Sequence, residues 1–259
     1  MLYIPHGGGP LPLLGDPAHR QLVEFLKSIP HSLGTPSAIV LISAHWEEER
    51  PTITGGIHPA LLYDYHGFPP ESYRIKYPAP GVPALAKQLH TLLEAGGLQS
   101  RLDERRGFDH GLFVPLKIMY PHADIPCVQL SLLASLDPKS HIAIGKALAP
   151  LRQENVLIIG SGFSFHNLKA FFTSPPGVPD QQNEAFNQWL IDTCTNEALS
   201  SDGREERLAY WTRAPSARYC HPREEHLLPL HVCWGIAQAT ARLVFHGEVL
   251  GKRTCAFLW

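Results

Sequence analysis

The chain has 259 residues, a formal net charge of -2 at pH 7 and 44% hydrophobic residues. These values predict one domain with a sizeable core and give no reason to expect nucleic acid or an anionic membrane as a partner. No apolar run reaches the roughly 18–20 residues of a membrane span, and no signal peptide is visible before His6, so a cytoplasmic protein is expected. The five scattered cysteines form no CxxC pair, which is typical of reduced thiols.

The first predicted strand covers Leu2–Pro5 and is followed by His6 and three glycines. Because glycine has no side chain, this loop would let the backbone pass close to whatever His6 contacts. Asp16 and Pro17 then predict a helix start, and a spaced apolar face extends that helix to Ile29.

The next strand is expected at Ala38–Ile42, a continuous apolar run rich in β-branched residues. Such a run predicts a strand buried on both faces, as in a parallel sheet covered by helices. The chain then becomes polar, so His45 is expected just past the carboxyl end of the strand, where ligands bind in open α/β sheets. The same layout recurs at Val156–Ile159, which precedes His166.

Residues 52–83 form a mostly irregular segment rich in aromatic residues and proline, followed by a predicted helix over Ala84–Glu94. Such a segment is either a wall for a substrate or a surface loop whose aromatic rings pack onto the domain. His110 follows Asp109 between two glycines, and a tight loop is expected to present it in a fixed direction.

The last third of the chain contains a histidine-rich stretch, in which His226 precedes an apolar helix that is expected to run to Ala241. Pro229 is compatible with that helix only in its first turn, and His231 is expected to be a structural histidine of the core. The remaining predicted elements are a strand (Ile125–Leu130), two helices (Ile142–Leu151, Asn183–Leu199), a proline-rich loop (Pro175–Pro179) and a closing hairpin (Leu243–Val249, Thr254–Leu258).

Five histidines share a placement at strand ends, in glycine-framed loops or before a helix: His6, His45, His110, His166 and His226. Taken one at a time, each would more often be structural. Their shared placement favours a cluster at one edge of the sheet, where three protein ligands and an open position would make a catalytic metal site.

Seven motifs resemble the class III extradiol dioxygenases (LigB superfamily), and more closely their DOPA 4,5-dioxygenase branch. They are HGGGP (6–10), ISAHW (42–46), YDYHGFP (63–69), YPAPG (77–81), GFDHG (107–111), SGFSFHNL (161–168) and EEHLLPLHV (224–232). The resemblance runs through nearly the whole chain. It implies one α/β domain over residues 1–259, with a mixed, mostly parallel sheet flanked by helices on both faces.

The resemblance also implies roles for the five histidines. The metal ligands would be His6, His45 and His226. His166 matches the base of the family, sometimes counted as a fourth ligand, and His110 matches a histidine of the substrate pocket. In that chemistry the ring of a catechol opens beside its two hydroxyl groups rather than between them.

The implied partners are a small aromatic catechol, such as DOPA, and O₂. Tyr65, His66 and Phe68 are candidates for the wall that contacts this substrate. The sequence does not separate a monomer from a homodimer.

The third ligand departs from the usual extradiol pattern, in which two histidines and one carboxylate bind Fe²⁺. Here His226 takes the place of the carboxylate, and three neutral histidines also suit Zn²⁺. Glu225 is adjacent, but neighbours on a helix point about 100° apart, so it is not expected to substitute. One divalent ion per chain, Fe²⁺ or Zn²⁺, is therefore expected.

Two other functions stay open on the sequence. A zinc hydrolase or lyase would use metal-bound water as nucleophile and His166 as base. A non-catalytic binding protein similar to the Memo proteins would have no use for that base, so the presence of His110 and His166 favours an enzyme.

Overall fold

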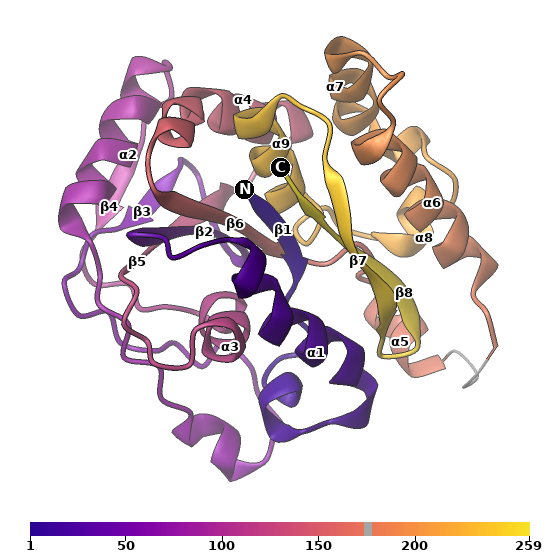
Figure 1. Ribbon diagram of the computed structural model, residues 1–259, viewed down its shortest axis with the longest axis horizontal. Helices are drawn as coiled ribbons and strands as arrows, with labels where there is room; N and C mark the ends of the chain where they lie inside the picture. Colours follow the sequence, from indigo (N-terminus) through magenta and orange to yellow (C-terminus); the bar gives the residue numbers. More distant parts are fainter. Residues whose placement is uncertain (174–177) are drawn as a thin grey trace.

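The computed structural model describes residues 1–173 and 178–259 (Figure 1). These residues form a mixed sheet of eight strands in the order β4-β3-β5-β2-β6-β1-β8-β7. The four central strands β5, β2, β6 and β1 are parallel, which confirms the mostly parallel sheet of one α/β domain. The strands are β1 (Leu2–Pro5), β2 (Ala38–Glu48), β3 (Thr52–Thr54), β4 (Arg101–Asp103), β5 (Cys127–Leu133), β6 (Val156–Gly162), β7 (Arg242–Val249) and β8 (Lys252–Leu258).

Helices cover both faces of the sheet, with α1 and α3 on one side and α2, α4 and α9 on the other (Figure 1). The α-helices are α1 (Arg20–Ser28), α2 (Pro83–Ala95), α3 (His110–Met119), α4 (Pro138–Ala147), α5 (Leu168–Thr173), α6 (Gln181–Thr195), α7 (Ser201–Ala209), α8 (Ala217–Cys220) and α9 (Leu228–Ala237). Among the described residues, no helix is long and apolar enough to cross a membrane.

The alternation of side chains along β2 explains why its sequence is continuously apolar. Ile39 and Leu41 pack into the core on the α1 and α3 side, whereas Val40 and Ile42 pack into the core on the α2, α4 and α9 side. All four side chains are fully buried. The strand buried on both faces that the sequence predicted is therefore confirmed.

A third apolar cluster joins α6, α7 and α8 to β8, the strand next to the edge strand β7 (Figure 1). The closing hairpin of β7 and β8 is confirmed, and β8 pairs antiparallel with β1. The five cysteines are free and buried, as expected of reduced, packed thiols.

Several predicted boundaries are wrong. β2 does not stop at Ile42 but continues to Glu48, with an irregular register against β5 between Ile42 and Glu47. Helix α9 ends at Ala237, where Gln238 adopts a left-handed conformation, rather than at Ala241. Helix α7 was not predicted because its sequence is polar. The loop expected at 175–179 lies mostly outside the described residues.

His141 on α4 is held neutral by two backbone partners. Its Nε2 accepts from the Leu133 N–H at 3.0 Å, so its Nδ1 donates to the Asp137 carbonyl at 2.7 Å. Burial lowers the pKa of His141 to about 4. Because the folded pKa lies below the unfolded value, the unfolded chain takes up more protons as the pH falls. The resulting stability is present above about pH 6.5 and is lost as the pH falls towards about 4.

We predict that His141→Gln, whose amide oxygen can still accept from Leu133, makes the free energy of unfolding less dependent on pH. Between about pH 6.5 and 4, the wild type should lose roughly 3 kcal/mol more than the variant. Urea unfolding across this range measures the difference, with the exposed His122→Gln as control. An equally steep fall in both proteins would contradict the assignment.

Candidate active site

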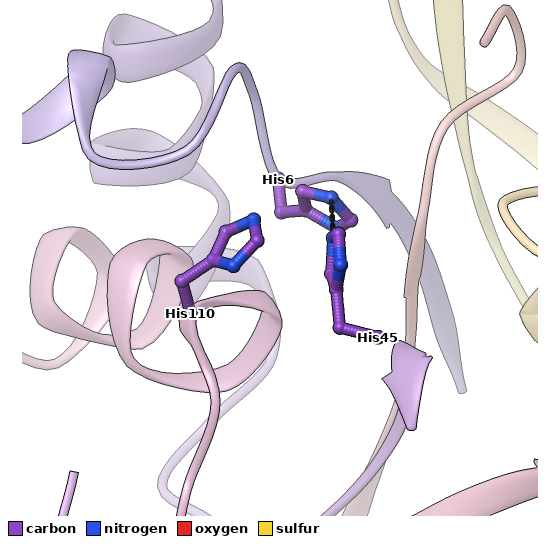
Figure 2. A group of neighbouring side chains, drawn as sticks. All are labelled: His6, His45 and His110. Carbon is purple, nitrogen blue, oxygen red and sulfur yellow. Dashed lines mark hydrogen bonds between the residues drawn. The ribbon is translucent and has the colours of Figure 1, made fainter. Parts of the chain in front are cut away.

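Three adjacent parallel strands bring histidines to one edge of the sheet. β6 pairs with β1 on one side and with β2 on the other, so the carboxyl ends of all three strands meet there. His6 follows β1 directly, His45 lies in the last part of β2, and His166 comes four residues after β6. Figure 2 shows the rings of His6 and His45 in contact, with His110 beside them.

His226 reaches this edge because the turn before α9 packs against the end of β6. Its carbonyl oxygen accepts from the Phe163 N–H at 2.9 Å and from the Tyr3 hydroxyl at 3.0 Å. A Cβ at Gly162 would lie 2.1 Å from that oxygen, so only glycine allows this approach. The backbone of His226 is therefore fixed to the sheet from two sides.

All five histidines that the sequence singled out lie in one cluster. The ring centroids of His6, His45 and His226 form a nearly equilateral triangle, with separations of 4.8, 4.9 and 5.2 Å. His110 lies against His45, with ring centroids 3.9 Å apart. His166 stacks on His226, with ring centroids 3.4 Å apart and 16° between the ring planes. His110 and His166 thus each lie against one ring of the triangle.

The tautomer of His6 follows from its hydrogen bonds. The Ser161 hydroxyl donates to the Gly111 carbonyl at 2.5 Å, so its oxygen accepts from His6 Nδ1 at 3.0 Å. With the proton on Nδ1, the lone pair of Nε2 is available to a cation. His6 Nε2 lies 2.9 Å from His45 Nε2. An oxygen partner on the far nitrogen is the usual way in which a protein orients a metal-binding imidazole.

Glu225 also belongs to the site, as a hydrogen-bond partner of two histidines, and the helix assumed at this position is wrong. Residues 225–227 form a turn ahead of α9, and the Glu225 side chain folds back towards the histidines. Its Oε1 lies 3.0 Å from Nδ1 of both His166 and His226. Burial alone would raise the pKa of Glu225, but the hydrogen bond from His166 and the nearby Arg223 hold it below its ordinary value. An ionised Glu225 accepts from both rings.

His110 is the first residue of α3 and not part of a tight loop, and its partner is Asp64 rather than the neighbouring Asp109. Asp64 Oδ1 accepts from the His110 backbone N–H at 3.0 Å and lies 2.8 Å from its Nδ1. Asp109 instead accepts from the Ser43 hydroxyl at 2.8 Å and from Arg106 at 3.1 Å. The two sequence neighbours therefore have different partners, and Asp64 comes from the YDYHGFP motif.

Burial lowers the pKa values of His6, His45 and His226 well below the ordinary value of 6.5, and the neighbouring imidazoles lower them further. A positive charge on one ring would lie within about 5 Å of the others, which disfavours protonation of each. These three side chains are therefore neutral imidazoles near pH 7. Neutral imidazole is the form that binds a transition metal.

The donor set fits a divalent transition metal. Ligand atoms of His6, His45 and His110 lie within 4.8 Å of one another, and so do those of His166, Glu225 and His226. The triangle of His6, His45 and His226 takes members from both groups. Imidazole nitrogen with one nearby carboxylate suits Fe²⁺ or Zn²⁺ better than Mg²⁺ or Ca²⁺, which prefer oxygen ligands.

A cavity of about 920 Å³ opens beside the histidines. Tyr65 and Phe68, two of the candidates for a substrate wall, line this cavity. His66 lies between them in sequence but is exposed and does not line the cavity. The remaining apolar lining among the described residues comes from distant segments and includes Leu11, Phe163, Leu168, Phe171 and Leu250.

Comparison with known proteins gives consistent matches. A family model described as "Catalytic LigB subunit of aromatic ring-opening dioxygenase" matches residues 3–254. The chain is 42% identical to "Dioxygenase tasH" of Hapsidospora irregularis, over 100% of this chain and 85% of that protein. It is 40% identical to "4,5-DOPA dioxygenase extradiol" of Beta vulgaris, over 91% of this chain and 85% of that protein. The crystal structure of an uncharacterized Escherichia coli K12 protein matches with a TM-score of 0.75 at 30% identity, over 91% of each chain.

We predict that Ser161→Ala lowers metal affinity about 10- to 100-fold, because His6 loses the acceptor that fixes its tautomer. The dissociation constant is measured by competition with a chromophoric chelator. Ser131→Ala is a matched control, since this buried hydroxyl accepts from the Thr52 N–H at 3.0 Å and has no contact with the histidines. Equal metal affinity in Ser161→Ala and the wild type would contradict the role of Ser161.

Proposed function

The chain belongs to the LigB family of aromatic ring-opening dioxygenases, and we propose that it opens the ring of a catechol beside its two hydroxyl groups, with O₂ as co-substrate. The observation that carries this proposal is the convergence of five histidines on one edge of an open cavity. The relatives named as DOPA dioxygenases support the extradiol position of cleavage.

His6, His45 and His226 are our proposed metal ligands. Their rings form the most regular triangle in the cluster, and all three are neutral because burial lowers their pKa values. Three ligands on one side of a metal leave positions open on the other side, as in the facial arrangement of non-haem Fe²⁺ oxygenases. A bound Fe²⁺ supplies one-electron chemistry between catecholate and O₂, which Zn²⁺ does not.

His166 and Glu225 form a proton-accepting pair in this proposal. Because Glu225 accepts from Nδ1 of His166 at 3.0 Å, the Nε2 of that ring carries the lone pair. His166 Nε2 would take a proton from a catechol hydroxyl, and the ionised Glu225 would stabilise the resulting imidazolium. Both His166 and Glu225 line the cavity, so the proton donor can reach them.

His110 would contact the substrate on the opposite side. Asp64 accepts from its Nδ1 at 2.8 Å. Burial would raise the pKa of Asp64, but this hydrogen bond and the further interactions with His110 and His45 together hold it below its ordinary value. The ring of Tyr65 lies 5.7 Å from that of His110 and, with Phe68, offers an aromatic wall to the catechol ring. Asp64 thus orients the ring of His110, and Tyr65 packs beside it.

The proposal is tested by oxygen uptake with a panel of catechols that includes DOPA. Protein reconstituted anaerobically with Fe²⁺ should consume one O₂ per ring-opened product, whereas protein loaded with Zn²⁺ should consume none. Absence of uptake across the panel, with iron occupancy confirmed, would contradict the dioxygenase. Substrate turnover by the zinc form without O₂ would instead indicate a hydrolase or lyase.

Single substitutions separate the proposed ligands from the proposed catalytic residues. We expect His45→Ala and His226→Ala to purify folded but with little or no metal. His166→Ala and His110→Ala should keep one ion per chain, while kcat falls by about 100-fold or more for His166→Ala. Metal analysis and kinetics on the same preparations measure both effects. If His226→Ala kept full metal occupancy while His110→Ala lost its metal, the third ligand would be His110 and not His226.

A further inference from the structure

The cavity has more room than a simple catechol needs. Its volume is about 920 Å³, whereas a cavity of about 150 Å³ already holds benzene. Away from the histidines, the wall among the described residues is mainly aromatic and aliphatic. These side chains are Leu11, Tyr65, Phe68, Phe163, Phe171 and Leu250.

Among the described residues, the rim of the cavity offers no unpaired Arg or Lys to a substrate carboxylate. Arg223 is the single Arg or Lys among the described residues that line it. Its Nη1 and Nη2 each lie 2.6 Å from one carboxylate oxygen of Glu47, and Nη1 lies 3.4 Å from Glu225. This bidentate pair occupies one N–H of each Nη, and the charge of Glu47 offsets that of Arg223. An acidic substituent would therefore have to compete with Glu47 for Arg223.

The backbone conformation of Leu250 is a second feature that points to an apolar substrate. It occupies the two-residue turn between β7 and β8 with a φ of 53°, next to Gly251 with a φ of 73°. Such a turn favours Asn-Gly, and a leucine there is strained. The side chain nevertheless lines the cavity and lies over the glycine loop, since a Cβ at Gly8 would be 3.1 Å from Leu250 Cδ1. The strained residue thus places an apolar group on the wall.

We propose that the substrate is an uncharged catechol with a bulky apolar substituent, and that Glu47, Arg223 and Leu250 select it over anionic and zwitterionic catechols such as DOPA. This inference rests on the proposed function, because it concerns the same cavity. Glu47 neutralises the cation of the rim, and Leu250 completes the apolar wall.

Binding without turnover tests the inference directly. Calorimetry on the zinc-loaded protein compares 3,4-dihydroxyphenylacetate with its methyl ester, which differ in charge and little in size. The ester should bind about tenfold more tightly, and a catechol with a larger apolar group should bind more tightly still. Equal or tighter binding of the acid, or of DOPA, would overturn the inference and leave the proposed function standing. Failure of every catechol to bind would contradict the proposed function and this inference with it.

Two neighbouring glutamates on β2 offer a matched pair of variants. Glu47→Gln releases the Arg223 fork and should tighten binding of the acid about three- to tenfold, with little change for the ester. Glu48→Gln is the control, because Glu48 pairs with Arg101 at 2.9 Å and does not line the cavity. An unchanged preference in Glu47→Gln would contradict the selective role of the pair.

The substitution Leu250→Asn separates the effect of Leu250 on substrate affinity from its effect on the stability of the fold. Asparagine suits the left-handed conformation, so the melting temperature should rise by about 2 °C or more. Affinity for the apolar catechols should nevertheless fall several-fold. A more stable variant that binds these catechols as tightly as the wild type would show that Leu250 does not select the substrate.

Discussion

The buried rings of His6, His45 and His226, whose centroids lie within 5.2 Å of one another, impose an electrostatic constraint on the whole site. Because protonation of one of these rings disfavours protonation of the other two, they are compatible with neutral imidazoles or with a bound cation, but not with several imidazolium ions. Oxygen acceptors complete this arrangement. Ser161, Glu225 and Asp64 hold the Nδ1 atoms of four rings and leave their Nε2 atoms for metal or substrate.

The fold brings these histidines together from distant segments of the chain at one edge of the sheet. Parallel pairing of β1, β6 and β2 aligns three carboxyl ends, while Gly162 lets the turn before α9 approach the sheet. Residues 223–227 include this turn and carry both Arg223 and Glu225, so one segment supplies a proposed ligand, the partner of the proposed base and the rim cation. The ion pair of Arg223 with Glu47 joins that turn to the strand that carries His45.

The sequence predicted the four central strands, the closing hairpin and all five histidines, because buried parallel strands leave an uninterrupted apolar signal. It missed the short strands β3 and β4 and the helices α3, α5, α7 and α8. It could not predict which oxygen orients which ring. Asp109 is adjacent to His110 yet faces Ser43, whereas Asp64 is far along the chain and bonds His110. Glu225 was set aside because a helix was assumed where the chain forms a turn. Such pairings depend on tertiary contacts, which have no local periodicity.

We expect His6, His45 and His226 to hold one metal ion while His110 and His166 remain free for the substrate. Anomalous diffraction at the absorption edge of iron, from crystals of the Fe²⁺ protein grown without oxygen, tests it most directly. We predict one ion bonded to the three histidines, with an open side towards the cavity. An ion bonded to His110 in place of His226, or one held by His166, Glu225 and His226, would contradict it.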